Sequence, residues 1–376
     1  MIGTGGSALV SKTLGQKENE KANKIFSMMI VFTTILGLIL SIIGIIFIRP
    51  VSYLLGASDE MIDNCVLYGR IVTSFTALFM LQNVFQSFLA TAEKPKIGLI
   101  VTIAAGTTNA VLDYLFVAVF NFGLAGAAIA TGIGQVVGGL IPLIYFILPN
   151  DSLLKLVKTK FSIKELLAAC ANGSSELMSN VSSSIVGMVY NLQLMKYIGE
   201  DGVATYGVLM YVQFVFVAIF IGYSIGTAPI VGYNYGATNY DELKNVRKKS
   251  IAIMFTTGIT LSIIAQLLAG TLAKIFVGYD QNLYVLTVHA FRIFSFAFIL
   301  TGFNIFSSSF FTALNNGAIS ALIAFLRTLV FQLGSVIMLP LIISVDGIWL
   351  AICVAEVFAT AISLFFMITK QKVYHY

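Results

Sequence analysis

The chain has 376 residues, of which 58% are hydrophobic and only 10% are charged. Soluble domains carry about 25% charged residues, so this composition excludes a water-soluble protein and predicts an all-α polytopic membrane protein. The formal net charge of +5 does not indicate nucleic-acid binding, because the basic residues lie in short loops.

Apolar runs follow one another along the chain, each long enough to cross a hydrocarbon core of about 30 Å. Residues 1–14 form a Gly-rich apolar piece too short to span, and a charged loop follows at 15–24. The run at 164–198 is long for one crossing, so it tilts or begins with an interfacial turn. We expect ten complete spans, at 25–48, 64–90, 97–120, 124–148, 164–198, 204–228, 246–277, 283–312, 317–343 and 347–369.

Lysine and arginine are distributed unequally between the two sets of loops. One set holds only Arg49, Lys196 and Lys274, so the positive-inside rule assigns the other set, and the C-terminus, to the cytoplasm. That set holds sixteen basic residues: Lys12, Lys17, Lys21, Lys24, Lys94, Lys96, Lys155, Lys158, Lys160, Lys164, Lys244, Arg247, Lys248, Lys249, Lys370 and Lys372.

The chain matches itself when it is shifted by 221 residues without a gap. The shift pairs Gly15 with Gly236, Asp59 with Asp280, and Asn83 with Asn304, among other matches. Six spans separate equivalent positions, so the repeats have the same orientation and predict two parallel six-helix lobes with a site between or within them. We expect a partial first lobe at 1–148, a cytoplasmic linker at 149–163 and a second lobe at 164–376.

The same shift predicts that the first lobe lacks one helix and most of a second. The spans at 164–198 and 204–228 have first-lobe counterparts that would begin about 58 residues before Met1. We therefore expect the chain to be an N-terminally truncated fragment, lacking the first helix and most of the second.

Asp113 lies within an apolar span, where a carboxylate costs about 2.5–3.5 kcal/mol and marks a transport pathway by default. Asn109 precedes it by one helical turn on the same face. Thr131 lies on the next span, about as far beyond the turn at 121–123 as Asp113 lies before it. We expect Asn109, Asp113 and Thr131 at similar depth; a static ion pair between Asp113 and Arg70 is the structural alternative.

Other intramembrane polar residues are candidates for a substrate cavity. A polar stripe on 164–198 includes Glu176 and Asn180, which line a cavity or serve helix packing. Glu356 has Arg292 and Arg327 on neighbouring spans, which favours a structural ion pair over a substrate site. Gln135 is the repeat equivalent of Glu356, and Gln213 is a further polar group within a span.

The remaining reactive residue types form no pattern of their own. Cys65, Cys170 and Cys353 have no paired spacing, so neither a disulfide framework nor a metal site is expected. His289 and His375 are expected to be isolated. No cluster of acids, bases or nucleophiles predicts an enzyme, and no cofactor is expected.

Four motifs are distinctive: GTGGSALVSKTLGQKENEKA at the N-terminus, Asn109 with Asp113, the FGLAGAAIAT that follows, and GTAPIVGYNYGA at 226–237. Together they resemble the MATE family, the multidrug and toxic compound extrusion antiporters. The resemblance covers essentially the whole chain. It implies two six-helix bundles in a V shape that work by alternating access, with Asn109, Asp113 and Thr131 in a site for Na⁺ or H⁺. The family's first-helix Asp has no counterpart in this sequence.

The resemblance implies a monomeric transporter in the plasma membrane that exports small amphipathic, often cationic compounds in exchange for Na⁺ or H⁺. Oxygen ligands at Asp113, Asn109 and Thr131 suit Na⁺, whereas a lone carboxylate with a raised pKa suits H⁺. Apart from membrane lipid and such compounds, no partner is expected. Two alternatives are a flippase for lipid-linked sugar precursors of a related fold and an inactive truncated remnant.

Overall fold

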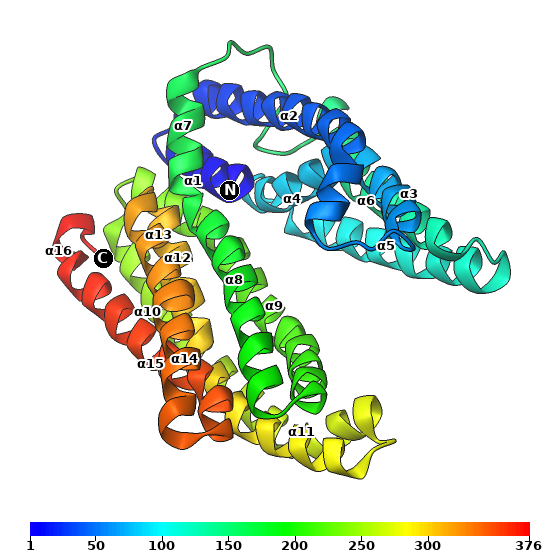
Figure 1. The fold of residues 1–376 in the computed structure, drawn as a ribbon. Coiled ribbons are helices and arrows are strands. Elements are labelled where there is room, and N and C mark those ends of the chain that lie inside the picture. The colour runs from blue at the N-terminus through cyan, green and yellow to red at the C-terminus, as the bar shows by residue number, and fades with distance from the viewer. The chain divides into compact units, whose positions relative to one another are not determined.

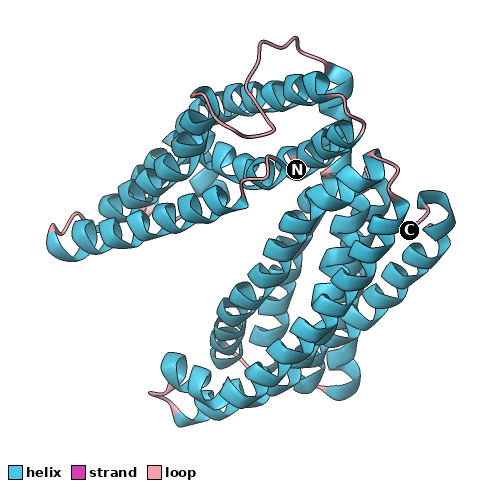
Figure 2. Cartoon of the chain, turned by 180° about the vertical axis from the view of Figure 1, so that it is seen from behind, coloured by secondary structure: helices cyan, strands magenta, loops and turns pink.

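The computed structural model describes all 376 residues, and every regular element in it is a helix (Figures 1 and 2). Contacts divide the chain into two units. The first unit comprises Ile2–Ala168, and the second comprises Ala169–Tyr376 together with Met1. The division falls inside helix α7 (Ile163–Asn172).

The first unit is a bundle in which α5 and α6 are the most extensively packed pair. Small residues allow close approach: an added methyl group at Gly37 would lie 2.6 Å from the Ala77 Cα, and one at Gly139 would lie 2.6 Å from the Leu78 carbonyl oxygen. Such contacts stabilise helix pairs in lipid, where water provides no driving force. Its elements before α7 are α1 (Ile2–Gly15), α2 (Asn19–Leu54), α3 (Ile62–Ser74), α4 (Thr76–Thr91), α5 (Pro95–Asp113), the π-helix η1 (Tyr114–Val119) and α6 (Gly123–Ile147).

The second unit is built around a core of aromatic side chains, including Trp349, Tyr190, Phe220 and Phe303, all fully buried. Helices α9, α10, α12 and α15 surround this core (Figure 1). Its elements after α7 are α8 (Ser174–Tyr197), α9 (Glu200–Gly236), α10 (Tyr240–Val277), α11 (Gln281–Phe294), the 3₁₀-helix η2 (Ser295–Ala297), α12 (Phe298–Ala313), α13 (Gly317–Phe325), the π-helix η3 (Leu326–Gln332), α14 (Leu333–Ile343), α15 (Val345–Thr369) and α16 (Gln371–Tyr374).

The 221-residue shift found in the sequence also relates the helix boundaries. Gly15 ends α1 and its equivalent Gly236 ends α9. Asn19 begins α2 and its equivalent Tyr240 begins α10. The break between α3 and α4 at Phe75 has its counterpart in η2. The two units therefore share one helix order, although their π-helices lie at different positions in the repeat.

Eight helices are long and apolar enough to cross a membrane, or nine when α3 and α4, which are bent by 48° relative to each other, count as one span. They correspond to nine of the ten expected spans. The run expected at 164–198 does not qualify, because it is interrupted at Gly173 and because Glu176, Asn180 and several serines reduce the hydropathy of α8.

The last residues of the chain fold back against the second unit. Tyr376 is fully buried: its hydroxyl donates to the Met367 carbonyl oxygen at 3.2 Å, and the Arg247 guanidinium lies 4.9 Å from its ring centre. The Tyr374 hydroxyl accepts a hydrogen bond of 2.6 Å from Asn316, just before α13. This aromatic tail connects α10, the start of α13 and the end of α15.

Replacing Tyr376 with Ala should destabilise the second unit, because removing a fully buried aromatic ring costs about 3–5 kcal/mol. We expect the thermal unfolding midpoint of the detergent-purified protein to fall by several degrees. The matched control is Val373→Ala, at an exposed neighbouring position, which should leave the midpoint unchanged. Equal midpoints for the two variants would show that the tail does not stabilise the bundle.

Candidate functional site

Asn109 and Asp113 contact each other on the last turn of α5. The Asn109 side-chain amide donates to the Asp113 carboxylate at 3.1 Å, as their spacing of one helical turn predicts. Helix α5 ends at Asp113, and the π-helix η1 follows directly. A π-turn widens the backbone and often marks a functional site, so the carboxylate lies where the regular helix is interrupted.

The second oxygen of Asp113 is buried and has no hydrogen-bond partner. Arg70 does not compensate this charge, because no ion pair joins the two residues and the Arg70 side chain is exposed. The static ion pair considered from the sequence is therefore absent. An unpartnered carboxylate oxygen in an apolar bundle is costly, and a proton or cation bound to it would lower that cost.

Thr131 lies on α6, opposite the end of α5. A methyl group added at Gly134 would lie 3.1 Å from the Asn109 Cβ, and one at Gly126 would lie 2.9 Å from the Phe116 Cβ. These two contacts bracket Thr131 and Asp113 along the antiparallel pair, which places the two at similar depth. No hydrogen bond joins Thr131 to Asp113, so two of the three expected residues touch and the third lies at similar depth on the neighbouring helix.

The expected cavity residues belong to both units, and their contacts differ. Glu176 is 46% exposed and pairs with the Met1 amino group at 2.8 Å. The Asn180 amide donates to the Glu176 carbonyl oxygen at 2.8 Å. Gln213 in the second unit and Gln135 in the first each bury a side-chain oxygen without a partner. A cavity role for these residues stays a prediction.

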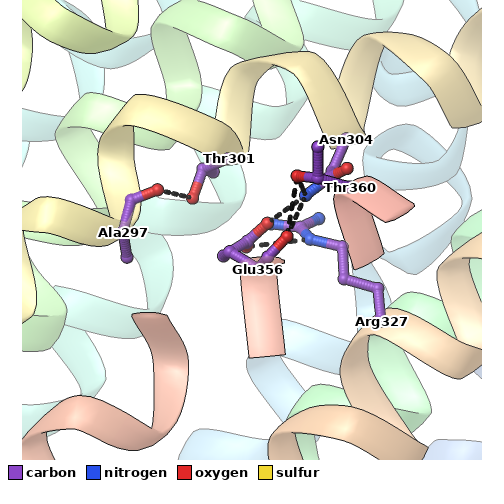
Figure 3. A network of polar contacts seen from close by, with 6 residues as sticks. All are labelled: Ala297, Thr301, Asn304, Arg327, Glu356 and Thr360. Carbon is purple, nitrogen blue, oxygen red and sulfur yellow. Dashed lines mark hydrogen bonds and ion pairs between the residues drawn. The ribbon is translucent and has the colours of Figure 1, made fainter. Parts of the chain in front are cut away.

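Glu356 forms the ion pair expected from the sequence, with Arg327 rather than Arg292 (Figure 3). The Arg327 Nε and Nη2 atoms donate to one carboxylate oxygen at 2.9 and 2.6 Å. The Asn304 amide donates to the other oxygen at 2.6 Å and lies 3.1 Å from the Thr360 hydroxyl. Since the Glu356 side chain is only 4% exposed, this carboxylate is fully partnered inside the second unit.

Sequence reasoning missed two polar contacts in the second unit. Asn304 was found only as the repeat match of Asn83, and no sequence signal indicated that it faces Glu356. His289 was expected to be isolated, which is wrong: its Nε2 lies 2.8 Å from the Asp346 carboxylate. The two residues are 57 positions apart, and only the packing of α11 against α15 brings them together.

Arg327→Met should destabilise the second unit by about 3–5 kcal/mol, because it leaves the buried Glu356 carboxylate without its cation. Adding Glu356→Gln should recover most of that loss, because the double variant buries no charge. The measurement is the thermal midpoint in detergent for wild type, both single variants and the double variant. A double variant no more stable than Arg327→Met would contradict a structural role for the pair.

Comparison with known proteins extends these observations to the whole chain. The MatE family model matches residues 1–115 and 177–337. The chain is 26% identical over 380 residues to the multidrug export protein MepA of Staphylococcus haemolyticus, which covers 99% of this chain and 82% of that protein. It is 28% identical over 271 residues to MepA of Staphylococcus saprophyticus, which covers 69% and 59%.

Solved structures with the same fold cover all of this chain and 84% of theirs. A crystal structure of MATE in the straight conformation superposes with a TM-score of 0.94 at 22% identity. The outward-facing structure of a multidrug resistance MATE family transporter gives the same values, and MATE in the bent conformation gives 0.91 at 21%. At this identity the similarity shows the fold. The segment expected before Met1 stays a prediction.

Proposed function

Since the chain belongs to the MatE family of membrane transporters, as its motifs predict, we propose that it is a cation-coupled antiporter that exports amphipathic, cationic compounds by alternating access. The relatives named multidrug export proteins support drug-like organic molecules as substrates. The fold shared with MATE structures in straight, bent and outward-facing conformations supports a protein that changes conformation during transport.

The observation that carries the proposal is the unpartnered oxygen of Asp113. One oxygen of this carboxylate accepts from Asn109, while the other is buried with no partner. Ionisable side chains in membrane spans are energetically costly, and they usually mark ion pathways. In contrast to Glu356, whose two oxygens are both occupied, Asp113 can gain or lose a positive ion without breaking an ion pair.

The coupling ion in this proposal is Na⁺ or H⁺. A proton would bind the free Asp113 oxygen directly. A sodium ion would need further oxygens, for which Thr131 on the facing helix and the Asn109 carbonyl are available after side-chain rotation. Either ion neutralises the carboxylate, so its binding and release would change the charge of the first unit during the cycle.

Asp113→Asn should abolish coupled export, because the amide cannot exchange a positive charge. We expect export of a fluorescent cationic dye, from cells lacking their own pumps, to fall at least about tenfold, which corresponds to about 1.4 kcal/mol. The protein is expressed from its complete reading frame, and dye export is measured with Na⁺ present or absent and with the pH gradient intact or collapsed.

The matched control is Asp63→Asn, which removes an exposed carboxylate from the same unit and should leave export unchanged. Normal export by a well-expressed Asp113→Asn protein would refute the coupling role. Export that stops when ATP is removed while the ion gradients are clamped would refute the antiporter. The ion whose gradient is required identifies the coupling ion.

We also propose that the protein lies in the plasma membrane with its C-terminus in the cytoplasm, on the basis of the sixteen basic residues in one set of loops. A reporter fused after Tyr376 that is active only in the cytoplasm should be active. The same fusion to a reporter that works only outside the cell should be inactive. The reverse pattern would invert the topology of every helix.

A further inference from the structure

The segment that connects α6 to α7 is extended and lies along the beginning of α2. The backbone amide of Lys155 donates to the Asn23 side chain at 2.9 Å, and that of Val157 donates to the Ser27 hydroxyl at 2.8 Å. Asn23 and Ser27 are one helical turn apart, so they present acceptors in line along α2. Farther along, the Phe161 ring lies 6.3 Å from that of Phe32. Figure 2 shows this segment as a long loop beside the helices.

Docking against α2 gives the segment an alternating pattern of burial. Ser152 and Leu154 are buried, whereas Leu153, Lys155 and Val157 between and after them are exposed. Extended backbone sends successive side chains to opposite sides, so Ser152 and Leu154 pack on the first unit while Leu153 and Lys155 face outward. From Val157 on, most side chains are exposed in both directions. We call residues 153–164 the linker surface.

Four lysines of the linker surface have no protein partner. All four are exposed, none takes part in an ion pair, and no acidic residue occurs between Asp151 and Glu165. They are Lys155, Lys158, Lys160 and Lys164.

Glu165, next to Lys164, forms no ion pair, but the other acidic residues near the segment are engaged elsewhere. Lys94 binds Asp151 at 2.8 Å, and this hydrogen bond holds the pKa of the Asp151 carboxyl below its usual range, so the pair persists at neutral pH. Glu18 and Glu20 bind Lys21 and Lys24 of α2 at 2.9 and 2.7 Å. The linker surface therefore carries an excess of positive charge that is not compensated by its protein neighbours.

Large apolar side chains lie between these lysines. Leu153, Val157, Phe161 and Ile163 are exposed, Phe161 by 62%. Exposed apolar groups interleaved with lysines are unsuited to bulk water, but they suit the boundary between lipid headgroups and acyl chains. The segment lies at the ends of two membrane-crossing helices, α6 and α2, which is where that boundary occurs.

We propose that the linker surface binds anionic phospholipids, with the four lysines contacting headgroup phosphates and the apolar side chains entering the acyl boundary. The positive-inside rule counts basic residues in loops whatever their conformation. Here the Asn23 and Ser27 contacts fix the backbone of the segment at Lys155 and Val157, next to Lys158. Each lysine near an anionic bilayer contributes roughly fivefold to binding, and salt weakens that contribution.

The test measures binding of phosphatidylglycerol to the detergent-purified protein by native mass spectrometry, with phosphatidylcholine of the same chain length as the neutral comparison. Replacing Lys155, Lys158, Lys160 and Lys164 with Gln should weaken phosphatidylglycerol binding at least tenfold and leave phosphatidylcholine binding unchanged. The matched control replaces four exposed, unpaired lysines elsewhere with Gln: Lys17, Lys248, Lys249 and Lys372. It removes the same charge and should change binding less than twofold.

A second variant tests the geometry without removing charge. Asn23→Ala with Ser27→Ala releases the segment from α2 and should weaken phosphatidylglycerol binding severalfold while all lysines remain. Equal losses in the linker variant and the charge-matched control would overturn the proposal, because net charge alone would then explain binding. Binding of soluble glycerol phosphate as tight as that of the lipid would also overturn it. Because the readout is lipid binding, failure of this proposal is separate from failure of the transport proposal.

Discussion

A carboxylate inside an apolar helix bundle is costly unless it is partnered, and the buried Glu356 and the half-buried Asp113 differ in how many partners they have. Glu356 has Arg327 on one oxygen and Asn304 on the other. Asp113 has Asn109 on one oxygen and nothing on the other. Removing a partner from a buried ion pair is strongly destabilising, so the contacts of Glu356 serve the stability of the second unit. The unpartnered oxygen of Asp113 is the feature on which the proposed coupling role rests.

The internal repeat shows that this difference occurs between two units that have the same order of helices. The 221-residue shift carries Asp113 onto Gly334, Arg327 onto Gly106 and Glu356 onto Gln135. Each unit therefore has a polar centre that the other lacks, although their helix boundaries coincide. In the first unit, Gln135 occupies the position of Glu356 and buries an unpartnered side-chain oxygen. This position is therefore polar in both units but charged only in the second. The helix arrangement is shared between the units, whereas the chemistry belongs to each one separately.

Features that depend on local spacing or composition could be predicted from the sequence. The Asn109–Asp113 contact follows from helical periodicity, and the Arg327–Glu356 pair follows from the cost of charge in hydrocarbon. Features that depend on tertiary packing could not. The run at 164–198 was expected to tilt or to begin with an interfacial turn and to carry a polar stripe, but hydropathy, which averages over neighbouring residues, could not locate its break at Gly173. The π-helix after Asp113 and the His289–Asp346 contact have no sequence pattern of their own.

The linker illustrates why charge counts alone give an incomplete description of a membrane protein. Lys94, Lys155 and Lys158 count equally in assigning topology, yet Lys94 is bound to Asp151, and the other two have no acidic partner. Asn23 and Ser27 accept hydrogen bonds from the backbone of the segment at Lys155 and Val157 and hold it on α2. In the proposed lipid site, these two neutral side chains fix the position of the charged segment. The anchored segment would move with α2 and the rest of the first unit, the unit that contains Asp113.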